Sequence, residues 1–203
     1  MKKALAFLMA AVMLMSMLTA CGNKDNAADN NDADNNDVNT EETDKAAADK
    51  VAALIDAIYV QERTEETDAQ CEAAKAAWDA LTDAQKALVE GEEASPDYFG
   101  LDTGDASKDD PRNQDEIGEK ELLVVSFGTS FNDSRVADIK SIEDALQEAN
   151  PDWSVRRAFT AQIIINHIQA RDGEKIDNME QALERAVANG VKQLVVQPTH
   201  LMH

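Results

Sequence analysis

The apolar run Leu-Leu-Val-Val at residues 122–125 limits the fold of this chain more than any other sequence feature. A strand with apolar residues at successive positions is buried on both faces, which is typical of a parallel sheet covered by helices. Two further strands are predicted at 153–159 and 192–198, with helices at 133–149, 161–170 and 177–189. Strands that alternate with helices pair in parallel through right-handed crossovers. Residues 120–203 are therefore predicted to form an α/β unit, a parallel sheet flanked by helices.

The N-terminus has the pattern of an export signal. Two lysines at positions 2 and 3 precede an apolar run from Ala4 to Leu18, and small residues then lead to Cys21. This order resembles a bacterial lipobox, in which the cysteine is lipidated and becomes the mature N-terminus. Residues 1–20 are predicted to be a lipoprotein signal peptide, and the protein is expected to be exported and lipid-anchored to the outer face of the cytoplasmic membrane. An ordinary signal peptide cleaved near Ala20 is the alternative.

Three segments of different composition follow the signal. Residues 21–44 are rich in Asn and Asp without periodicity, which predicts a disordered acidic tether. Residues 45–91 carry apolar stripes at helical spacing and predict a small all-α module, similar to the alanine-rich three-helix modules of Gram-positive surface proteins. A spacer role is favoured over a binding role for this module. Residues 92–119 combine Pro, Gly and many acidic residues, which predicts a linker in which Tyr98 and Phe99 pack against a domain.

Charge and cysteine content exclude some classes of function. The chain has 40 Asp and Glu against 19 Lys and Arg, a net charge of −21, so we expect no nucleic acid as partner. A basic patch that binds a membrane surface is excluded for the same reason. The two cysteines are too few for a disulfide framework. With Cys21 predicted as the lipidation site, Cys71 is interpreted as a bystander in a charged helical segment rather than as a nucleophile.

The carboxyl ends of the predicted strands are where a ligand is expected, because ligands of parallel sheets bind at that edge. Three segments follow those ends, at 126–131, 158–160 and 197–200. The first can hold an anion through free backbone N–H groups, or be a purely structural turn. It has neither a Walker loop nor a G-x-G-x-x-G pattern, so we expect no nucleotide. His200 can ligate a divalent ion or move a proton, or be a half-buried polar residue, whereas His167 is interpreted as a surface or packing residue.

Several stretches within residues 120–203 resemble the anaerobic sirohydrochlorin cobaltochelatase family of the CbiK type. They include the opening strand Glu121-Leu122-Leu123-Val124-Val125-Ser126-Phe127-Gly128-Thr129-Ser130, then Arg157-Ala158-Phe159-Thr160, Arg171-Asp172-Gly173 and the closing strand Val195-Val196-Gln197-Pro198-Thr199-His200. The spacing of these stretches matches the first half of the family. The predicted tether and helical module lie outside the resemblance.

The resemblance implies a class II chelatase α/β fold of two similar half-domains with a cleft between them, of which this chain holds the N-terminal half. It implies a metal chelatase (a lyase) that inserts Co²⁺, its substrate metal, into sirohydrochlorin without ATP in anaerobic cobalamin biosynthesis. The family's paired metal-binding histidines and their acidic partner belong to the second half, so no catalytic residue is assigned here. We therefore expect the chain to be a fragment that is inactive alone. The residues expected to bind the tetrapyrrole are Ser126, Gly128, Thr129, Ser130, Phe159, Thr160 and His200, and His200 is also the candidate metal contact.

A second function stays open beside the chelatase. A non-enzymatic surface lipoprotein could reuse the same fold to bind a tetrapyrrole or a metal ion. Export favours this alternative, because the other steps of cobalamin synthesis are cytoplasmic. In both cases the expected partners are a tetrapyrrole and, through the lipid anchor, a membrane, and homo-oligomerisation is left open.

Overall fold

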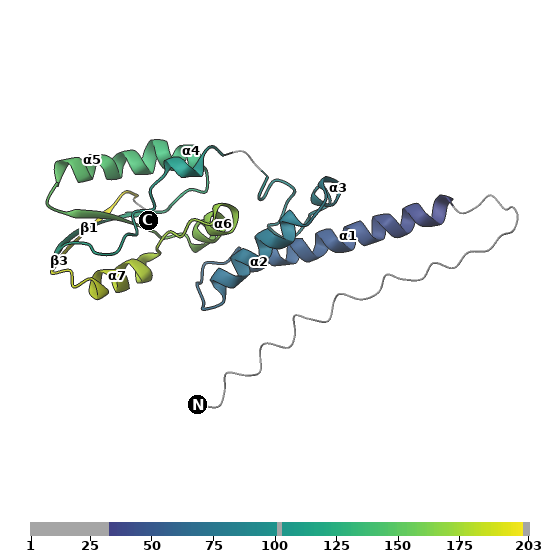
Figure 1. Ribbon diagram of the computed structural model, residues 1–203, viewed down its shortest axis with the longest axis horizontal. Coiled ribbons are helices and arrows are strands. Elements are labelled where there is room, and N and C mark those ends of the chain that lie inside the picture. Colours follow the sequence, from purple (N-terminus) through teal and green to yellow (C-terminus); the bar gives the residue numbers. More distant parts are fainter. Residues whose placement is uncertain (1–32, 101–102, 201–203) are drawn as a thin grey trace, which may run out of the picture. The chain divides into compact units, whose positions relative to one another are not determined.

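The computed structural model describes residues 33–100 and 103–200, with side chains from residue 40 onward (Figure 1). The predicted signal peptide, the lipidation site Cys21 and His203 lie outside these residues. Within the described ranges, no helix combines the length and the apolar character needed to cross a membrane.

Three parallel strands form the sheet in the C-terminal part of the chain. They are β1 (Lys120–Ser126), β2 (Ser154–Phe159) and β3 (Gln193–Pro198), in the order β2-β1-β3. In the register, Leu123 of β1 lies between Arg156 of β2 and Val196 of β3. β1 carries the apolar run and occupies the centre, where both of its edges are paired and its residues from Glu121 onward are buried. The predicted parallel α/β architecture is confirmed.

Helices cover the two faces of this sheet at β1 and β2. After β1 the chain forms α4 (Asn132–Ser134), the π-helical turn η2 (Arg135–Lys140) and α5 (Ser141–Ala149) without a break. Leu146 of α5 packs on one face, against Leu122, Val124 and Val155. On the other face, Leu123 and Val125 pack with residues of α7 (Met179–Ala188), and α6 (Gln162–Asp172) precedes it (Figure 1). Successive strand residues therefore point to opposite helices, as the pleat of a strand requires.

Strand β3 differs from its two partners. All six of its residues are exposed, including Leu194, Val195 and Val196. One of its edges pairs with β1, and the other has no partner strand among the described residues. The apolar run that suggests a covered strand is thus open to solvent in the part of the chain that the structure describes.

The N-terminal helical segment consists of α1 (Ala33–Ile58), α2 (Thr67–Asp79) and α3 (Asp83–Lys86). The predicted capping box at the start of α3 is present, because Thr82 accepts a hydrogen bond from the Gln85 N–H and the Gln85 side chain accepts one from Thr82. The core of this helical segment contains residues of α1 and α2 together with the aromatic pair Tyr98 and Phe99, which pack there as predicted.

Helix α1 begins earlier than the sequence predicts. Residues 21–44 are predicted to be a disordered tether, whereas the structure is helical from Ala33. Helix formation is costly to start but cheap to extend, and the buried turns of α1 between Ala48 and Ile58 provide the start. The polar residues before Ala48 can therefore continue the helix although they carry no apolar stripe.

Helix α2 packs against α6, a contact that no pattern in the sequence predicts. At its centre, the Cys71 thiol donates a hydrogen bond to the Asn166 carbonyl at 3.6 Å, and Asn166 Nδ2 donates to the Ile58 carbonyl at 2.8 Å. Cys71, interpreted as a bystander in a charged helical segment, is therefore fully buried. Burial raises the pKa of its thiol to about 11, so the thiol stays protonated at neutral pH, in line with a residue that is not a nucleophile.

Candidate functional site

The carboxyl edge of the sheet brings together the three segments that the sequence singles out. The Thr160 N–H donates to the Ser126 carbonyl at 2.9 Å, which joins the ends of β2 and β1. The Thr199 N–H donates to the Val125 carbonyl at 2.9 Å, and its hydroxyl lies 2.8 Å from the Ser126 hydroxyl, which joins the ends of β3 and β1. The predicted substrate-binding residues therefore do lie along one edge, although their role as ligands stays a prediction.

The turn after β1 packs closely against the ring of Phe159 at Gly128. Gly128 has φ +101°, and a Cβ at this position would lie 2.6 Å from Phe159 Cδ2. Only a glycine combines this backbone conformation with so close an approach. Phe159 itself is fully buried, so its ring packs under the turn inside the protein and is not exposed to solvent.

The free backbone N–H groups that could bind an anion at this turn are fewer than the sequence suggests. The Phe131 N–H donates to Thr129 Oγ1, and the Asp133 N–H donates to the Thr103 carbonyl. The carbonyls of Thr129 and Ser130 accept hydrogen bonds from arginines 135 and 171. The alternative of a structural turn therefore fits better, with the Thr129 and Ser130 backbone fixed from the protein side.

His200 lies just past β3, beside the exposed ring of Phe127. The two ring centroids are 6.3 Å apart and meet edge to face. His200 Nδ1 is buried and has no hydrogen-bond partner among the described residues. The residues from 40 to 100 and 103 to 200 contain no group of three His, Cys, Asp or Glu side chains arranged to hold a metal. His200 as a metal contact thus stays a prediction.

His167 is a packing residue, as interpreted. Its ring stacks on Tyr98 with centroids 4.3 Å apart. Burial, helped by the positive charge of Arg171, lowers its pKa to about 4, so the imidazole is neutral at physiological pH. This contact holds the segment around Tyr98 against α6.

Two cavities open beside the carboxyl edge, and each combines residues of the α/β unit with residues that precede it. The first, about 240 Å³, adjoins the end of β2 and is lined by Gln61, Phe159, Thr160, Gln162, Asn178, Met179 and Glu180. The second, about 190 Å³, contains Ser130 from the turn after β1 together with Tyr98, His167 and Arg171. Two of the predicted substrate-binding residues therefore line the first cavity, and one lines the second.

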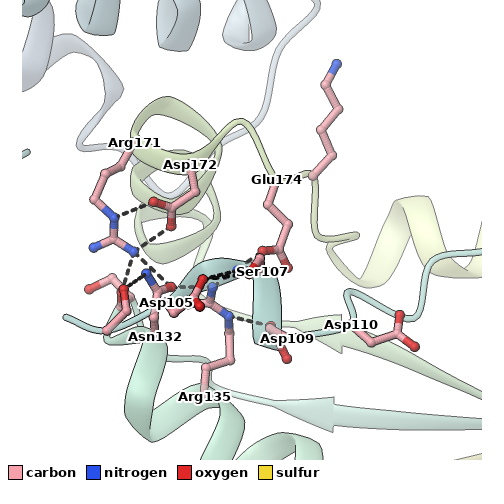
Figure 2. Close-up of polar contacts among 12 residues, drawn as sticks. Asp105, Ser107, Asp109, Asp110, Asn132, Arg135, Arg171, Asp172 and Glu174 are labelled. Carbon is pink, nitrogen blue, oxygen red and sulfur yellow. Dashed lines mark hydrogen bonds and ion pairs between the residues drawn. The ribbon is translucent and has the colours of Figure 1, made fainter.

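A network of buried arginines near this edge is the main feature that the sequence does not predict. Arg157 of β2 is fully buried and makes two hydrogen bonds at 2.8 Å to Glu143 of α5 and two, at 2.7 and 2.9 Å, to Asp109. Asp109 also accepts from Arg135 at 2.6 Å (Figure 2). On the opposite face of β2, Arg156 pairs with Glu121 and Asp177. Two adjacent arginines in an otherwise apolar strand are the signal that could have revealed it.

The network fixes the segment predicted as a linker. Burial disfavours the charge on Asp109, but the hydrogen bonds and charges of Arg157 and Arg135 outweigh it, and the pKa of this carboxyl is lowered. Glu174 lies at the edge of the same cluster, 3.5 Å from Arg135 (Figure 2). Burial raises the pKa of Glu174 to about 7, because Arg135 compensates only in part and the charge of Asp109 adds repulsion.

We predict that the stability of the protein falls as the pH rises from about 4.5 to 7. Across this range the folded protein keeps the proton on Glu174 while the unfolded chain releases it, so folding becomes less favourable. The loss is about 2 kcal/mol, less than the full shift would give because the side chain keeps some contact with water. Glu174→Gln, which mimics the protonated form, should lack this loss, whereas Glu148→Gln on exposed α5 should retain it. Urea unfolding at several pH values measures both, and equal slopes for the two variants would contradict the assignment.

Comparisons with known proteins agree on the C-terminal part of the chain. Residues 120–203 match the family model described as cobalt chelatase (CbiK). The chain is also 40% identical, over 85 residues, to the sirohydrochlorin cobaltochelatase of Salmonella typhimurium. That alignment covers 42% of this chain and 32% of the relative, so the chain spans about a third of the relative's length. The resemblance read from the sequence is confirmed for this region.

Proposed function

We propose that residues 120–203, as a CbiK-type region, form the N-terminal half of a sirohydrochlorin cobaltochelatase and bind the tetrapyrrole at the carboxyl edge of their sheet. The observation that carries the proposal is the convergence of Ser126, Thr160 and Thr199-His200 at one edge, within the region that matches the family. Strands in a sheet are ~5 Å apart, so the ends of β2 and β3 lie about 10 Å from each other. That span is comparable with the width of a tetrapyrrole macrocycle.

The side chains at this edge suit such a ligand. Phe127 and Phe131 are 43% and 50% exposed, so both rings can offer apolar area to a macrocycle. His200, beside Phe127, supplies an imidazole that can contact Co²⁺ or accept a pyrrole proton. Cobalt insertion replaces two pyrrole protons by one metal ion, so it needs bases and metal ligands on the enzyme. His200 provides one such group, and the paired histidines implied by the resemblance belong to the second half.

The finer parts of the function rest on the resemblance. We propose that the reaction proceeds without ATP and belongs to anaerobic cobalamin biosynthesis, with Co²⁺ as substrate. Export and the lipid anchor at Cys21 stay predictions, because residues 1–32 lie outside the described range.

The test is a titration of the 203-residue protein with sirohydrochlorin, followed by absorbance. We expect saturable binding, and His200→Ala should weaken it by about tenfold, as the loss of one well-placed polar contact does. Gln70→Ala, at an exposed position of α2, should leave the affinity unchanged. Binding without any acceleration of cobalt insertion would support a half-domain that needs its partner half. Absence of binding would overturn the proposal, and insertion faster than the spontaneous rate would overturn the division of labour between the halves.

A further inference from the structure

Gln61 belongs to the N-terminal helical segment but lies at the edge of the sheet where the tetrapyrrole is proposed to bind. It lies between α1 and α2, outside the region that matches the cobalt chelatase family. It nevertheless lines the cavity of about 240 Å³ at the end of β2, together with Phe159 and Thr160. The packing of α2 on α6 is what places this loop there.

The orientation of the Gln61 amide is fixed by one hydrogen bond. Its Oε1 accepts from the Gln162 N–H at 3.0 Å, in the first turn of α6. Gln162 is the first residue of α6, where backbone N–H groups have no acceptor within the helix, so Gln61 satisfies one of them from outside the helix. The Oε1 is therefore directed at α6, and Nε2 is left as the free end of an exposed side chain, without a hydrogen bond to any described residue.

The other polar groups of the cavity divide into used and unused ones. The side chains of Gln162 and Asn178 bond to each other and to Asn166 and the Gln181 N–H. Thr160 is exposed, and its hydroxyl makes no hydrogen bond within the described residues. Glu180 also lines the cavity, and its carboxylate would repel an anionic ligand. Among the side chains that line this cavity, the donor groups that make no hydrogen bond within the described residues are thus Gln61 Nε2 and Thr160 Oγ1, whereas Gln162 Nε2 and Asn178 Nδ2 each donate one.

We propose that Gln61 is a substrate-binding residue, whose Nε2 donates a hydrogen bond to a carboxylate side chain of the tetrapyrrole in this cavity. The inference rests on the proposed function, because it takes sirohydrochlorin, which carries several carboxylates, as the ligand. It adds a contact that the matched half-domain does not contain by itself. The helical segment then has a role in binding, beyond that of a spacer.

The most informative variant is Gln61→Glu, because it tests the role of Nε2 separately from that of Oε1. Glutamate keeps an oxygen that can accept from the Gln162 N–H, but it replaces the Nε2 donor by negative charge. We expect an unchanged melting temperature and about tenfold weaker binding of sirohydrochlorin by the 203-residue protein. Glu180→Gln removes the negative charge from the same cavity and should tighten binding by a few-fold. Gln70→Glu makes the same charge change as Gln61→Glu on the exposed surface of α2 and should alter neither quantity.

The outcomes separate the inference from the proposed function. If wild type binds and the affinities of Gln61→Glu and Gln70→Glu are equal, Gln61 is not a contact and the proposed function stands. If wild type does not bind at all, both fail. If Gln61→Glu lowers the melting temperature, Glu180→Gln still decides, because unchanged affinity in that variant would exclude a carboxylate in the cavity. Sirohydrochlorin with its carboxyl groups esterified provides a last check, since it should bind wild type and Gln61→Glu equally.

Discussion

Replacing Arg157 by methionine should lower the free energy of unfolding by about 3–5 kcal/mol, the usual cost of leaving buried charges without their partner. Arg157 makes four hydrogen bonds to two carboxylates, Glu143 and Asp109, and all three side chains are fully buried. Without the guanidinium, both carboxylates lose their main counter-charge, although Arg135 still contacts Asp109 and Arg112 lies near Glu143. Urea unfolding followed by circular dichroism measures the effect.

A surface pair provides the control for this prediction. Lys192 and Glu119 form an ion pair in which both side chains are about two-thirds exposed. Lys192→Met should change the free energy of unfolding by less than ~1 kcal/mol, because water screens such a pair. A similar small effect for Arg157→Met would show that the Asp109 segment is not held by the network, and would leave its position unexplained.

Gly128→Ala should cost about 3 kcal/mol of stability and weaken tetrapyrrole binding at the same time. The left-handed backbone costs an alanine about 1–2 kcal/mol, and overpacking against a buried ring adds a further 1–3 kcal/mol. Phe159 cannot move aside easily, because it packs in a cluster with Ile165, Ile168 and Ile176. Binding should weaken because the displaced turn lies between Phe127 and Phe131, whose exposed rings belong to the proposed site.

Gly173 is a matched control, since it also has a positive φ, +71°, but a Cβ there would have no atom within 4 Å. Gly173→Ala should therefore show the backbone cost alone, about 1 kcal/mol, with unchanged affinity for sirohydrochlorin. Melting curves and absorbance titrations of the two alanine variants, side by side, measure both effects. Equal losses of stability would mean that the contact between Gly128 and Phe159 is not tight in solution.

The strands and their common edge could be predicted because the signal is local. A continuous apolar run such as Leu122–Val125 has few solutions other than a covered parallel strand, and the topology of such a sheet then places the strand ends together. The turn at Gly128 and the half-buried position of His200 follow from that placement. The residues at the carboxyl edge of the sheet can therefore be predicted without knowledge of their side-chain contacts.

What could not be predicted depends on contacts between distant parts of the chain. The stripe on α2 shows which face is buried, but no periodicity names α6 as the partner or brings Gln61 to the end of β2. Arginines are usually exposed, so the residue type of Arg156 and Arg157 predicts exposure. Their charges can be buried only because Asp109, Glu143 and Asp177 lie close enough to form ion pairs with them. The start of α1 at Ala33 likewise follows from cooperativity with packed turns far along the helix.

The contact between α2 and α6 also constrains how this protein can diverge. Cys71 and Asn166 meet in a fully buried interface, where Asn166 additionally bonds to the carbonyl of Ile58. A larger residue at Cys71, or an apolar one at Asn166, would leave a clash or an unpaired carbonyl that only a compensating change across the interface relieves. Homologues that carry both segments should therefore keep a small residue at position 71 and a side chain that donates a hydrogen bond at position 166. A protein that matches the same family model without the helical segment is free of that constraint and can place a different residue on this face of α6.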